Sequence, residues 1–357
     1  MSAPNLTRRD LLGAAAAAAG TAVHLAPSEA ESASRRWAAK PPKGFARLSI
    51  PGKVVKVHRP GSLTENGAFP KPEAPPAMLE AALKALTGKP TLREAFATFV
   101  HPDDVVAIKV NGISGRKSMK MATNVELVAA VARGVLEVGV PADKITVFEQ
   151  YKEFLLATRC VTDLETLAPS PVMPPGLRYT CHLNKEAEME EFVVGTSVTR
   201  YVTAFTSASV VINVTQMKDH SICGFTGAMK NITHGCNVNP HQFHAHTASP
   251  QIAHLYAQDV VKSRVALHVT DAFQVIYDEG PIDVNPLRRV PHECVYASTD
   301  PVALDVIGCE VIERLRKENG LPTLADAGRD PAYLRVAGEL GLGVAERASI
   351  SLRELRA

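Results

Sequence analysis

Lysine, histidine and asparagine side chains gather in the stretch HSICGFTGAMKNITHGCNVNPHQFHAH, residues 220–246. Lys218 and His220 follow directly after the apolar run ASVVINVTQM, which predicts a buried strand. Lys230 and His234 lie four residues apart, so on a helix they would share one face. A lysine stabilises developing negative charge and a histidine moves a proton. Because charges at buried strand ends are costly unless they are paired or used, these residues predict a site for an anionic or carbonyl-bearing ligand.

A second group of polar side chains lies at the end of the run DDVVAIKVN, which predicts a strand buried on both faces. The strand end and the following loop contain Lys109, Asn111, Arg116, Lys117 and Lys120. Ligands of open α/β sheets bind at the carboxyl ends of the strands, where the N-terminus of the next helix favours anions. The loop therefore predicts substrate binding through a phosphate, sulfate or carboxylate group, with a solvated basic loop as the alternative. Its glycine spacing excludes a Walker loop.

Histidines in and after the predicted helix suggest a metal site. The candidate ligands are His234, His241, His244 and His246, with Cys223 or Cys236 as further donors. Imidazole and thiolate groups suit zinc, copper or nickel, although no standard zinc spacing is present. A solvated polar loop is the alternative, because no carboxylate lies within the loop. The two cysteines form either a disulfide that closes a small loop or two buried thiols.

The segments that must position these residues alternate between β-branched runs and helical patterns, which is typical of βαβ units. We therefore predict an α/β fold, a mostly parallel sheet with helices on both faces, and an irregular insertion or lid from 168 to about 192. The predicted strands are 103–111, 144–150, 208–218, 265–273 and 292–298, with a hairpin or two short strands at 47–61 and an edge strand at 350–355. The predicted helices are 71–88, 91–100, 124–140, 249–264, 300–320 and 330–341. Thr91, Ser249 and Asp300 are predicted to cap three of them.

The central run VVINVTQMKDHSICGFTGAMKNITHG resembles the signature of the DUF362 family, a strand with K-x-H followed by a T-G-x-x-K-N segment. DDVVAIKVN, VTDAFQVIYDEGP and STDPVALDVIG resemble further elements of that family, in the expected order over residues 100–310. The resemblance implies a set of recurring polar residues: Lys109, Asn111, Lys218, His220, Thr226, Lys230, Asn231, Asp271, Asp300 and Asp305. The family name records an unknown function. Some members carry ferredoxin-like iron–sulfur modules, but this chain has no C-x-x-C spacing of the kind such clusters use.

Residues 1–30 resemble a twin-arginine export signal. They combine Arg8 and Arg9 in TRRDLLG with a short alanine-rich segment and small residues at which a signal peptidase could cut. The apolar run is shorter than the ~20 residues that span a bilayer, so we predict no membrane span in the mature chain. The resemblance implies the twin-arginine translocase as a partner, export in the folded state and a periplasmic location. Residues 31–44 are then a linker, and residues 45–357 form the DUF362-like domain.

The composition is that of a globular protein, with 46% hydrophobic residues in a chain of 357. A formal net charge of +2 and an aromatic content of 5% argue against nucleic-acid binding, which usually needs a basic face with stacking aromatic rings. We therefore expect a small-molecule ligand rather than a nucleic acid.

Together these features predict an exported enzyme that acts on a small anionic or oxygen-rich substrate, with a divalent metal as an optional cofactor. The expected catalytic residues are Lys218, His220, Lys230 and Asp271. The expected substrate-binding residues are Lys109, Asn111, Arg116, Lys117, Thr226 and Asn231. Hydrolysis, isomerisation and lyase chemistry all use such groups, so the reaction type stays open. The alternative function is that of a periplasmic metal- or anion-binding accessory protein of a redox system.

Overall fold

The computed structural model describes residues 34–115, 121–181, 187–244 and 248–357. The predicted export signal, Arg116, Lys117, Lys120 and His246 lie outside these ranges. No helix within the described ranges is long and apolar enough to cross a membrane.

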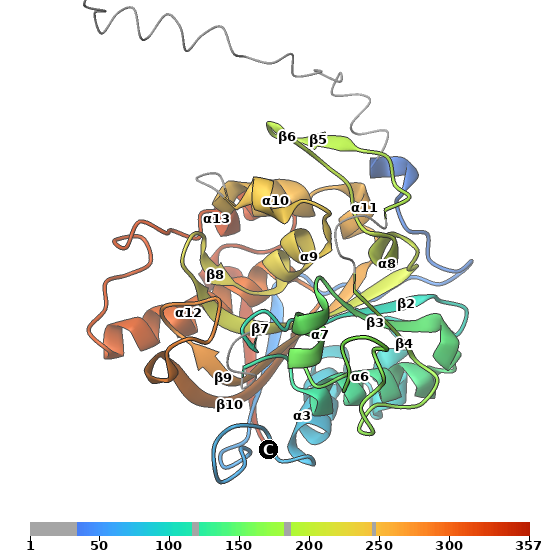
Figure 1. Cartoon of the computed structure of the whole chain (residues 1–357), viewed down its shortest axis with the longest axis horizontal. Coiled ribbons are helices and arrows are strands. Elements are labelled where there is room, and N and C mark those ends of the chain that lie inside the picture. The colour runs from blue at the N-terminus through green and yellow to red at the C-terminus, as the bar shows by residue number, and fades with distance from the viewer. Residues whose placement is uncertain (1–33, 116–120, 182–186, 245–247) are drawn as a thin grey trace, which may run out of the picture.

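A sheet of nine strands forms the centre of the molecule (Figure 1). Its strands follow the order β11-β1-β10-β9-β7-β2-β3-β4, and β8 pairs with β7. In this sheet β8 and β10 run against the other strands, so the predicted, mostly parallel sheet is confirmed. The strand bounds are β1 Lys53–His58, β2 Val106–Lys109, β3 Ile145–Glu149, β4 Arg178–Cys181, β7 Val210–His220, β8 Gly224–Thr226, β9 Val265–Ile276, β10 Arg289–Ser298 and β11 Ser351–Arg356. A separate hairpin pairs β5 Phe192–Val194 with β6 Ser197–Thr199.

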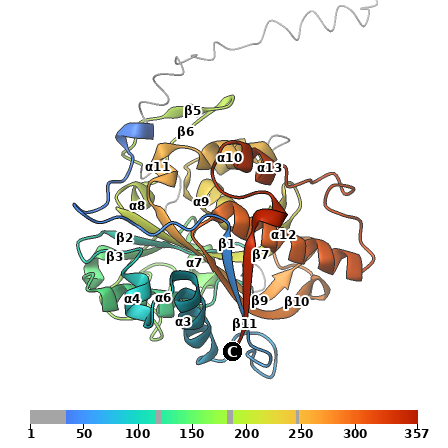
Figure 2. The same cartoon turned by 180° about the vertical axis from the view of Figure 1, so that it is seen from behind.

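Helices cover both faces of the sheet, as predicted (Figures 1 and 2). On one face lie α3 Ala74–Thr87, α4 Leu92–Phe96 and α6 Val125–Val138, which share an apolar core with the strands. On the other lie α9 Ala228–Cys236, α10 Ala248–Tyr256, α12 Pro301–Glu318 and α13 Tyr333–Glu339. The shorter helices are α7 Lys152–Ala157, α8 Thr203–Thr206, α11 Asp259–Lys262, and the 3-10 turns η1 Ala142–Lys144, η2 Pro240–Phe243, η3 Pro286–Arg288 and η4 Arg347–Ser349.

Local sequence signals set several helix ends. The Thr91 hydroxyl accepts a hydrogen bond from the Glu94 N–H and caps α4. The Asp300 carboxylate accepts from two N–H groups in the first turn of α12. These two predicted caps are confirmed. Gly139 ends α6 in the left-handed conformation, with φ 110°, and the chain then returns to the sheet as β3 beside β2.

The helix predicted at 249–264 is two helices, α10 and α11, because Gln258 between them has an extended backbone. Ser249 lies inside α10 and does not cap it. Its hydroxyl donates to the Asp330 carbonyl and accepts from the Tyr333 N–H, so it joins α10 to the start of α13. The predicted cap at Ser249 is therefore wrong.

Two further segments differ from the prediction. Residues 47–61 contain one strand, β1, which lies between β10 and β11 instead of forming a hairpin. The segment 168–192 is irregular over most of its described residues, as predicted, but it also contributes β4 to the sheet edge beside β3. Its prolines indicated an insertion or lid, but Arg178–Cys181 has the aromatic and β-branched residues that strands favour. All six cysteines are described and free, so Cys223 and Cys236 are two buried thiols.

Candidate functional site

The carboxyl ends of β2, β3 and β7 lie side by side, because these strands are parallel and β2 lies between the other two. Lys109 ends β2 and Glu149 ends β3, while β7 continues past them to Lys218 and His220. Helix α9 begins soon after β7 and β8 and carries Lys230. This topology brings together lysines that are far apart in the sequence.

The Lys109 side chain is fully buried and has three hydrogen-bond acceptors. Its Nζ lies 2.6 Å from the Val110 carbonyl oxygen, 2.7 Å from Glu149 Oε2 and 3.3 Å from Asn231 Oδ1. The ion pair with Glu149 is itself buried. Gly235 of α9 leaves room for this arrangement, because a Cβ there would lie 2.8 Å from Lys109 Cε. Lys109 therefore holds α9 against the end of β2 and β3.

The Lys218 side chain is also fully buried and has three acceptors. Its Nζ lies 2.6 Å from Asn111 Oδ1, 2.7 Å from Ser114 Oγ and 3.3 Å from Gln216 Oε1. Burial lowers the pKa of Lys218 well below its usual value, and the charge of Glu149 opposes that shift. Because a neutral amine has only two N–H groups and would leave one acceptor unbonded, we assign the ammonium form.

Asn231 connects the two lysines. Its Oδ1 accepts from Lys109 Nζ and, at 2.9 Å, from Asn111 Nδ2, while Asn111 Oδ1 accepts from Lys218. We call Lys109, Asn111, Glu149, Lys218 and Asn231 the lysine network. All five side chains are buried. Such a network is rigid when every polar group in it has a partner.

A second row of polar groups supports the lysine network from inside the sheet. Asn231 Nδ2 donates to Asn213 Oδ1 at 2.7 Å, and Asn213 Nδ2 lies 3.0 Å from His268 Nδ1. His268 Nε2 lies 3.2 Å from the Tyr256 hydroxyl. Burial lowers the pKa of His268 to about 3, so the imidazole is neutral and its Nδ1 accepts from Asn213.

Lys230 has a different environment from the other two lysines. Its Nζ lies 2.9 Å from His244 Nε2, and His244 Nδ1 lies 2.9 Å from the Pro240 carbonyl oxygen. Because a carbonyl oxygen only accepts, the proton of the imidazole is on Nδ1, and Nε2 accepts from Lys230. Burial lowers the pKa of Lys230, and it lowers the pKa of His244 to about 4. We call these two residues the Lys230–His244 pair.

Two further imidazoles pack against His244. The His220 ring stacks on it with centroids 5.6 Å apart, and the His234 ring meets it edge-on at 4.6 Å. His220 Nδ1 accepts from the Ile222 N–H at 3.1 Å, and His234 Nε2 donates to the Phe243 carbonyl at 3.0 Å. Burial lowers the pKa of both rings well below its usual value.

Of the predicted metal ligands that the structure describes, His234 and His244 are in ring contact, but His241 does not join them. His241 is exposed, and both ring nitrogens of His244 are occupied by hydrogen bonds. Within the described ranges, no three or more histidine, cysteine, aspartate or glutamate side chains are arranged to hold a metal ion. Because His246 lies outside those ranges, metal binding at the histidines stays a prediction, and we assign no metal ligand.

A small cavity opens between the lysine network and the Lys230–His244 pair. Its volume is about 60 Å³. Its polar lining consists of Lys109, Asn111, Glu149, Gln150, Thr226, Lys230, Asn231, His234 and His244. The Thr226 hydroxyl is buried and has no hydrogen-bond partner among the described residues. We call this space the strand-end cavity. Lys218 and His220 are next to it in the fold but are not among its lining residues.

Glu149 and Gln150 are the lining residues that sequence reasoning missed. Both are at the end of the predicted strand KITVFEQ, so a signal was present: a carboxylate at the end of a buried parallel strand is costly unless it is paired. Glu149 Oε2 is held by Lys109, and its Oε1 accepts from the Gly112 N–H at 3.3 Å. Glu149 is therefore the counter-ion of the lysine network.

The model of a domain of unknown function, DUF362, matches residues 106–310. The chain belongs to the DUF362 family. The match covers every strand and helix that contributes a polar side chain to the strand-end cavity. No curated protein matches the chain. Membership confirms the family resemblance, and the family description assigns no reaction to the site.

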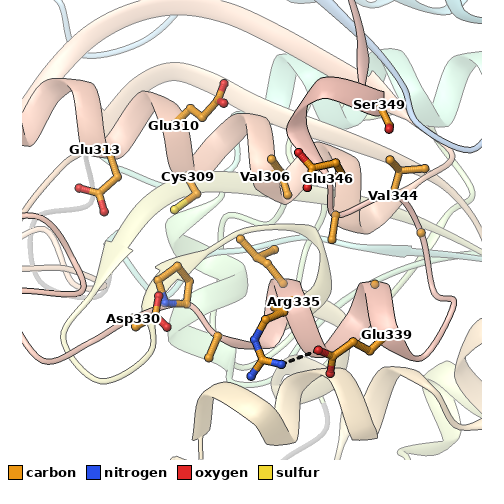
Figure 3. A pocket seen from close by; sticks show the side chains of 16 residues that line it. Val306, Cys309, Glu310, Glu313, Asp330, Arg335, Glu339, Val344, Glu346 and Ser349 are labelled. Atoms are coloured by element: carbon orange, nitrogen blue, oxygen red, sulfur yellow. Dashed lines mark hydrogen bonds and ion pairs between the residues drawn. The ribbon is translucent and has the colours of Figure 1, made fainter.

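This DUF362 protein also has a larger hollow, with a volume of about 1170 Å³, beside α12 and α13 (Figure 3). Val306 and Cys309 lie on one side of it, and Arg335 pairs with Glu339 on the other. Its described lining contains no lysine or histidine and none of the residues that the sequence singled out. We therefore place the candidate site of this family member in the smaller strand-end cavity.

Asp271, predicted to be catalytic, is not among the lining residues of the strand-end cavity. Its carboxylate accepts from the Asn124 backbone N–H at 2.7 Å and from the Asn124 amide at 2.9 Å. Asn124 directly precedes α6, so Asp271 fixes the start of that helix against β9. Burial raises the pKa of Asp271 to about 6. The structure thus gives this family residue a positioning role.

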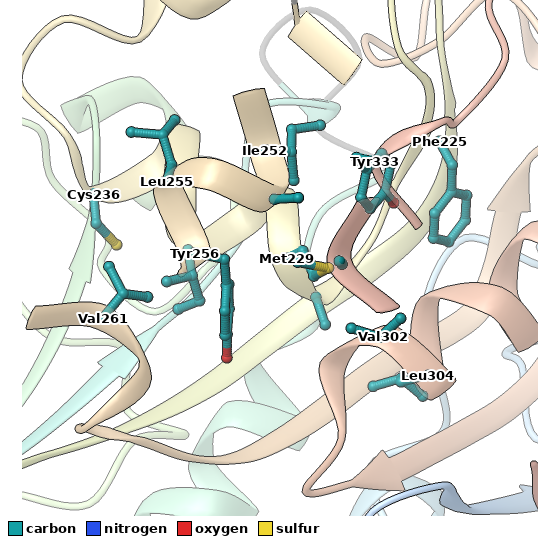
Figure 4. Close-up of a cluster of buried hydrophobic side chains, with 14 of the residues drawn as sticks. Phe225, Met229, Cys236, Ile252, Leu255, Tyr256, Val261, Val302, Leu304 and Tyr333 are labelled. Carbon is teal, nitrogen blue, oxygen red and sulfur yellow. The ribbon is translucent and has the colours of Figure 1, made fainter. Parts of the chain in front are cut away.

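Asp305 of α12 holds the start of α9, which carries Lys230. Its carboxylate accepts from the Ala228 N–H at 2.5 Å and from the Met229 N–H at 3.0 Å. Gly227 permits this contact, because a Cβ there would lie 2.1 Å from Asp305 Oδ1. Burial raises the pKa of Asp305 to about 7. Apolar side chains of α9, α10 and α12 pack together around Met229 and complete the support of α9 (Figure 4).

Proposed function

We propose that this DUF362 protein is an enzyme that acts on a small anionic, oxygen-rich substrate in the strand-end cavity. The proposal is supported above all by the charge balance at the cavity wall. Lys109 and Lys218 are held as ammonium groups by three acceptors each, and Glu149 is the carboxylate whose charge acts on Lys218. Two positive charges and one negative charge leave a net positive charge beside the cavity. A bound anion would offset it, because buried charge without a counter-ion is costly.

The cavity also contains hydrogen-bond donors that protein groups do not fully use and that could bond to a ligand. The Thr226 hydroxyl has no partner among the described residues, and Lys230 Nζ has one. Both side chains come from the segment between β8 and the first turn of α9, where the backbone is fixed by Asp305. A preorganised donor pair of this kind stabilises charge that develops on a substrate oxygen.

Proton transfer is assigned to the Lys230–His244 pair. Lys230 Nζ and His244 Nε2 are within direct hydrogen-bond distance and both line the cavity. Lys218 supplies charge and holds Asn111 and Ser114, since its three N–H groups are used. His220 positions His244 by stacking. These roles fit isomerisation, lyase or hydrolytic chemistry next to a carboxylate or phosphate group.

Anion binding is the first test of this function. Isothermal titration calorimetry with inorganic phosphate, oxalate and malonate should show binding to the full chain, and Lys230→Met should weaken it about ten-fold or more, as expected for a lost charged hydrogen bond. The matched control is Lys262→Met, a half-exposed lysine of α11. Equal affinity in wild type, Lys230→Met and the control, or no binding of any of the three anions by the wild type, would contradict the proposal.

Export through the twin-arginine pathway is proposed on the resemblance of residues 1–30 alone. Expression of the full chain in a bacterium with that pathway, followed by N-terminal sequencing of the periplasmic protein, should find a mature chain that begins near residue 31. Replacing Arg8 and Arg9 by lysine should retain the precursor in the cytoplasm. A periplasmic protein that still begins at its original N-terminus would argue against cleavage, and equal export of the lysine variant would argue against this pathway.

The accessory-protein alternative depends on metal binding by His234, His241, His244 and His246. Elemental analysis of protein purified separately from cytoplasm and periplasm tests it. Stoichiometric metal that is lost in a His241→Ala, His246→Ala double variant would favour the metal-binding role over the enzyme. Protein without metal from both compartments would remove its main support.

A further inference from the structure

We propose that Lys230 is a nucleophile that forms an imine with the carbonyl carbon of a small oxo acid. The inference rests on the proposed function, because it uses the same cavity, and it narrows the substrate class to a molecule with both a carbonyl and a carboxylate group. Its basis is the contrast between Lys230 and the other two buried lysines of the site.

Lys230 is buried without the partners that would hold it as an ammonium ion. Its Nζ makes one hydrogen bond, to a ring nitrogen, whereas Lys109 and Lys218 each donate to three oxygen acceptors. Among the described residues, no carboxylate lies within ion-pair distance of Lys230 Nζ. Desolvation is one of the conditions under which a lysine amine becomes nucleophilic. The lowered pKa of Lys230, caused by burial, is consistent with this state.

His244 is placed to act as the base. Its Nε2 lies 2.9 Å from the amine, and its Nδ1–H is fixed by the Pro240 carbonyl at 2.9 Å. Nucleophile, base and a third group that orients the base are the arrangement found in activated nucleophiles. The imidazoles of His220 and His234 hold the His244 ring in place from two sides. Lys230 and His244 both line the cavity in which the carbonyl carbon would be bound.

The chemistry balances without a further reactant. The Nζ lone pair attacks the carbonyl carbon, a C–N bond forms, and the carbonyl π electrons move to the oxygen. His244 takes one proton from nitrogen and passes it to that oxygen. The second nitrogen proton follows the same path, the C–O bond breaks, and the nitrogen lone pair forms the C=N bond. One amine and one carbonyl compound thus give one imine and one water molecule.

The size and charge of the cavity select the carbonyl compound. The cavity is small, about 60 Å³, which favours a short ligand. A carboxylate on that ligand would offset the positive charge of the lysine network and would accept from the Thr226 hydroxyl. Glyoxylate and pyruvate are the smallest oxo acids with both groups, and we take them as probes.

Reductive trapping tests the imine directly. The full-length protein is incubated with glyoxylate and sodium cyanoborohydride, and the carboxymethylated lysines are located by peptide mass spectrometry. Lys230 should react several-fold faster than Lys262, because burial lowers the pKa of Lys230 and so raises its fraction of neutral amine. Excess oxalate should slow the labelling of Lys230 and leave that of Lys262 unchanged. Labelling of Lys230 no faster than Lys262 would overturn the inference.

A variant that keeps hydrogen-bond donors separates this inference from the proposed function. Lys230→Arg keeps N–H donors at the site but cannot form an imine, so it should bind oxalate and lose the trapped adduct at position 230. His244→Asn should slow trapping at Lys230 with little effect on Lys262. Wild type that binds oxalate but gives no adduct at Lys230 would overturn the imine and leave the anion-binding enzyme standing. Absence of both oxalate binding and adduct would overturn both.

Discussion

The lysine network and the Lys230–His244 pair both contribute to the lining of one small cavity, and both contain buried lysines. In the network, each ammonium group has three oxygen acceptors and Glu149 supplies a counter-charge. In the pair, one amine faces one imidazole. Burial alone therefore does not distinguish a lysine that stabilises the fold from one that can react. The number and type of hydrogen-bond acceptors distinguish them, because a lysine with three oxygen acceptors is fixed in its charged form.

The comparison predicts its largest effect on stability at Lys109. Lys109→Met removes one partner of a buried ion pair and leaves the Glu149 carboxylate without its counter-ion, so the free energy of unfolding should fall by about 3–5 kcal/mol. Urea unfolding followed by circular dichroism measures the loss. A double variant, Lys109→Met with Glu149→Gln, should recover part of it, because the orphan charge is then gone.

Lys56 provides the matched control for that measurement. It too lies on a strand and pairs with a glutamate, Glu354, at 2.9 Å, but the Glu354 side chain is 59% exposed. Lys56→Met should therefore cost less than about 1 kcal/mol. If Lys109→Met proved no more destabilising than Lys56→Met, the lysine network would not be the stabilising half of the site.

The second-largest effect is expected from acid, through the histidine behind the network. The pKa of His268 is about 3 in the folded protein because of burial, against 6.5 when unfolded. Between these values the unfolded chain binds a proton that the folded one does not, so stability present above pH 6.5 is lost as the pH falls. His268 should account for a loss on the order of 4 kcal/mol by pH 3.

The test compares the pH dependence of urea midpoints in wild type, His268→Gln and His254→Gln, the last an exposed histidine of α10. His268→Gln should flatten the acid limb and His254→Gln should leave it unchanged. Asp305 has the opposite effect on stability, because its pKa is raised to about 7 and the folded state is therefore destabilised as the pH rises. This contribution is the same in all three proteins, so it cancels when their urea midpoints are compared. Parallel acid limbs for all three proteins would show that His268 is already solvated in the folded state.

The sequence predicted the place of the site better than the division of roles within it. Strand patterns placed Lys109 and Lys218 at the ends of two predicted strands, and the structure shows that these strands are neighbours and brings both lysines to one network. Which lysine is fully bonded depends on contacts such as Lys218 with Asn111, separated by 107 residues, and no local pattern records them. Asp271 illustrates the same limit, because its partner Asn124 comes from a different part of the fold.

The fold class was predicted correctly, and the individual elements that were predicted wrongly failed for related reasons. The apolar spacing of 249–264 is helical throughout, and only the extended backbone at Gln258 divides it. The proline-rich start of 168–192 indicated a loop, but a later part of the segment, β4, pairs with the edge strand β3. Caps that depend on adjacent residues, at Thr91 and Asp300, were predicted correctly, whereas the Ser249 hydroxyl bonds α13, which is distant in sequence.

A smaller effect on stability is expected at Lys230 itself. Lys230→Met keeps the length of the side chain and removes an amine with a single partner, so the free energy of unfolding should change by less than about 1.5 kcal/mol. The same urea titration measures it. A loss as large as that of Lys109→Met would mean that Lys230 is held as a charged group, and the contrast between the lysine network and the Lys230–His244 pair would fail.

Thr226→Val should have the smallest effect on stability and a clear one on the ligand. The Thr226 hydroxyl is buried with no partner among the described residues, so replacing it by a methyl group of similar size removes a desolvated polar atom without breaking a hydrogen bond. The unfolding free energy should stay the same or rise by about 1 kcal/mol. Oxalate affinity, measured by calorimetry, should fall about five-fold or more if the hydroxyl donates to the carboxylate.

Thr199 provides the matched control. It is also buried, but its hydroxyl donates to Asn239 Oδ1 at 2.6 Å, so Thr199→Val should lower stability and leave oxalate affinity unchanged. A Thr226→Val protein that loses stability like Thr199→Val would mean that water already satisfies the hydroxyl, which would then be no free donor for a ligand.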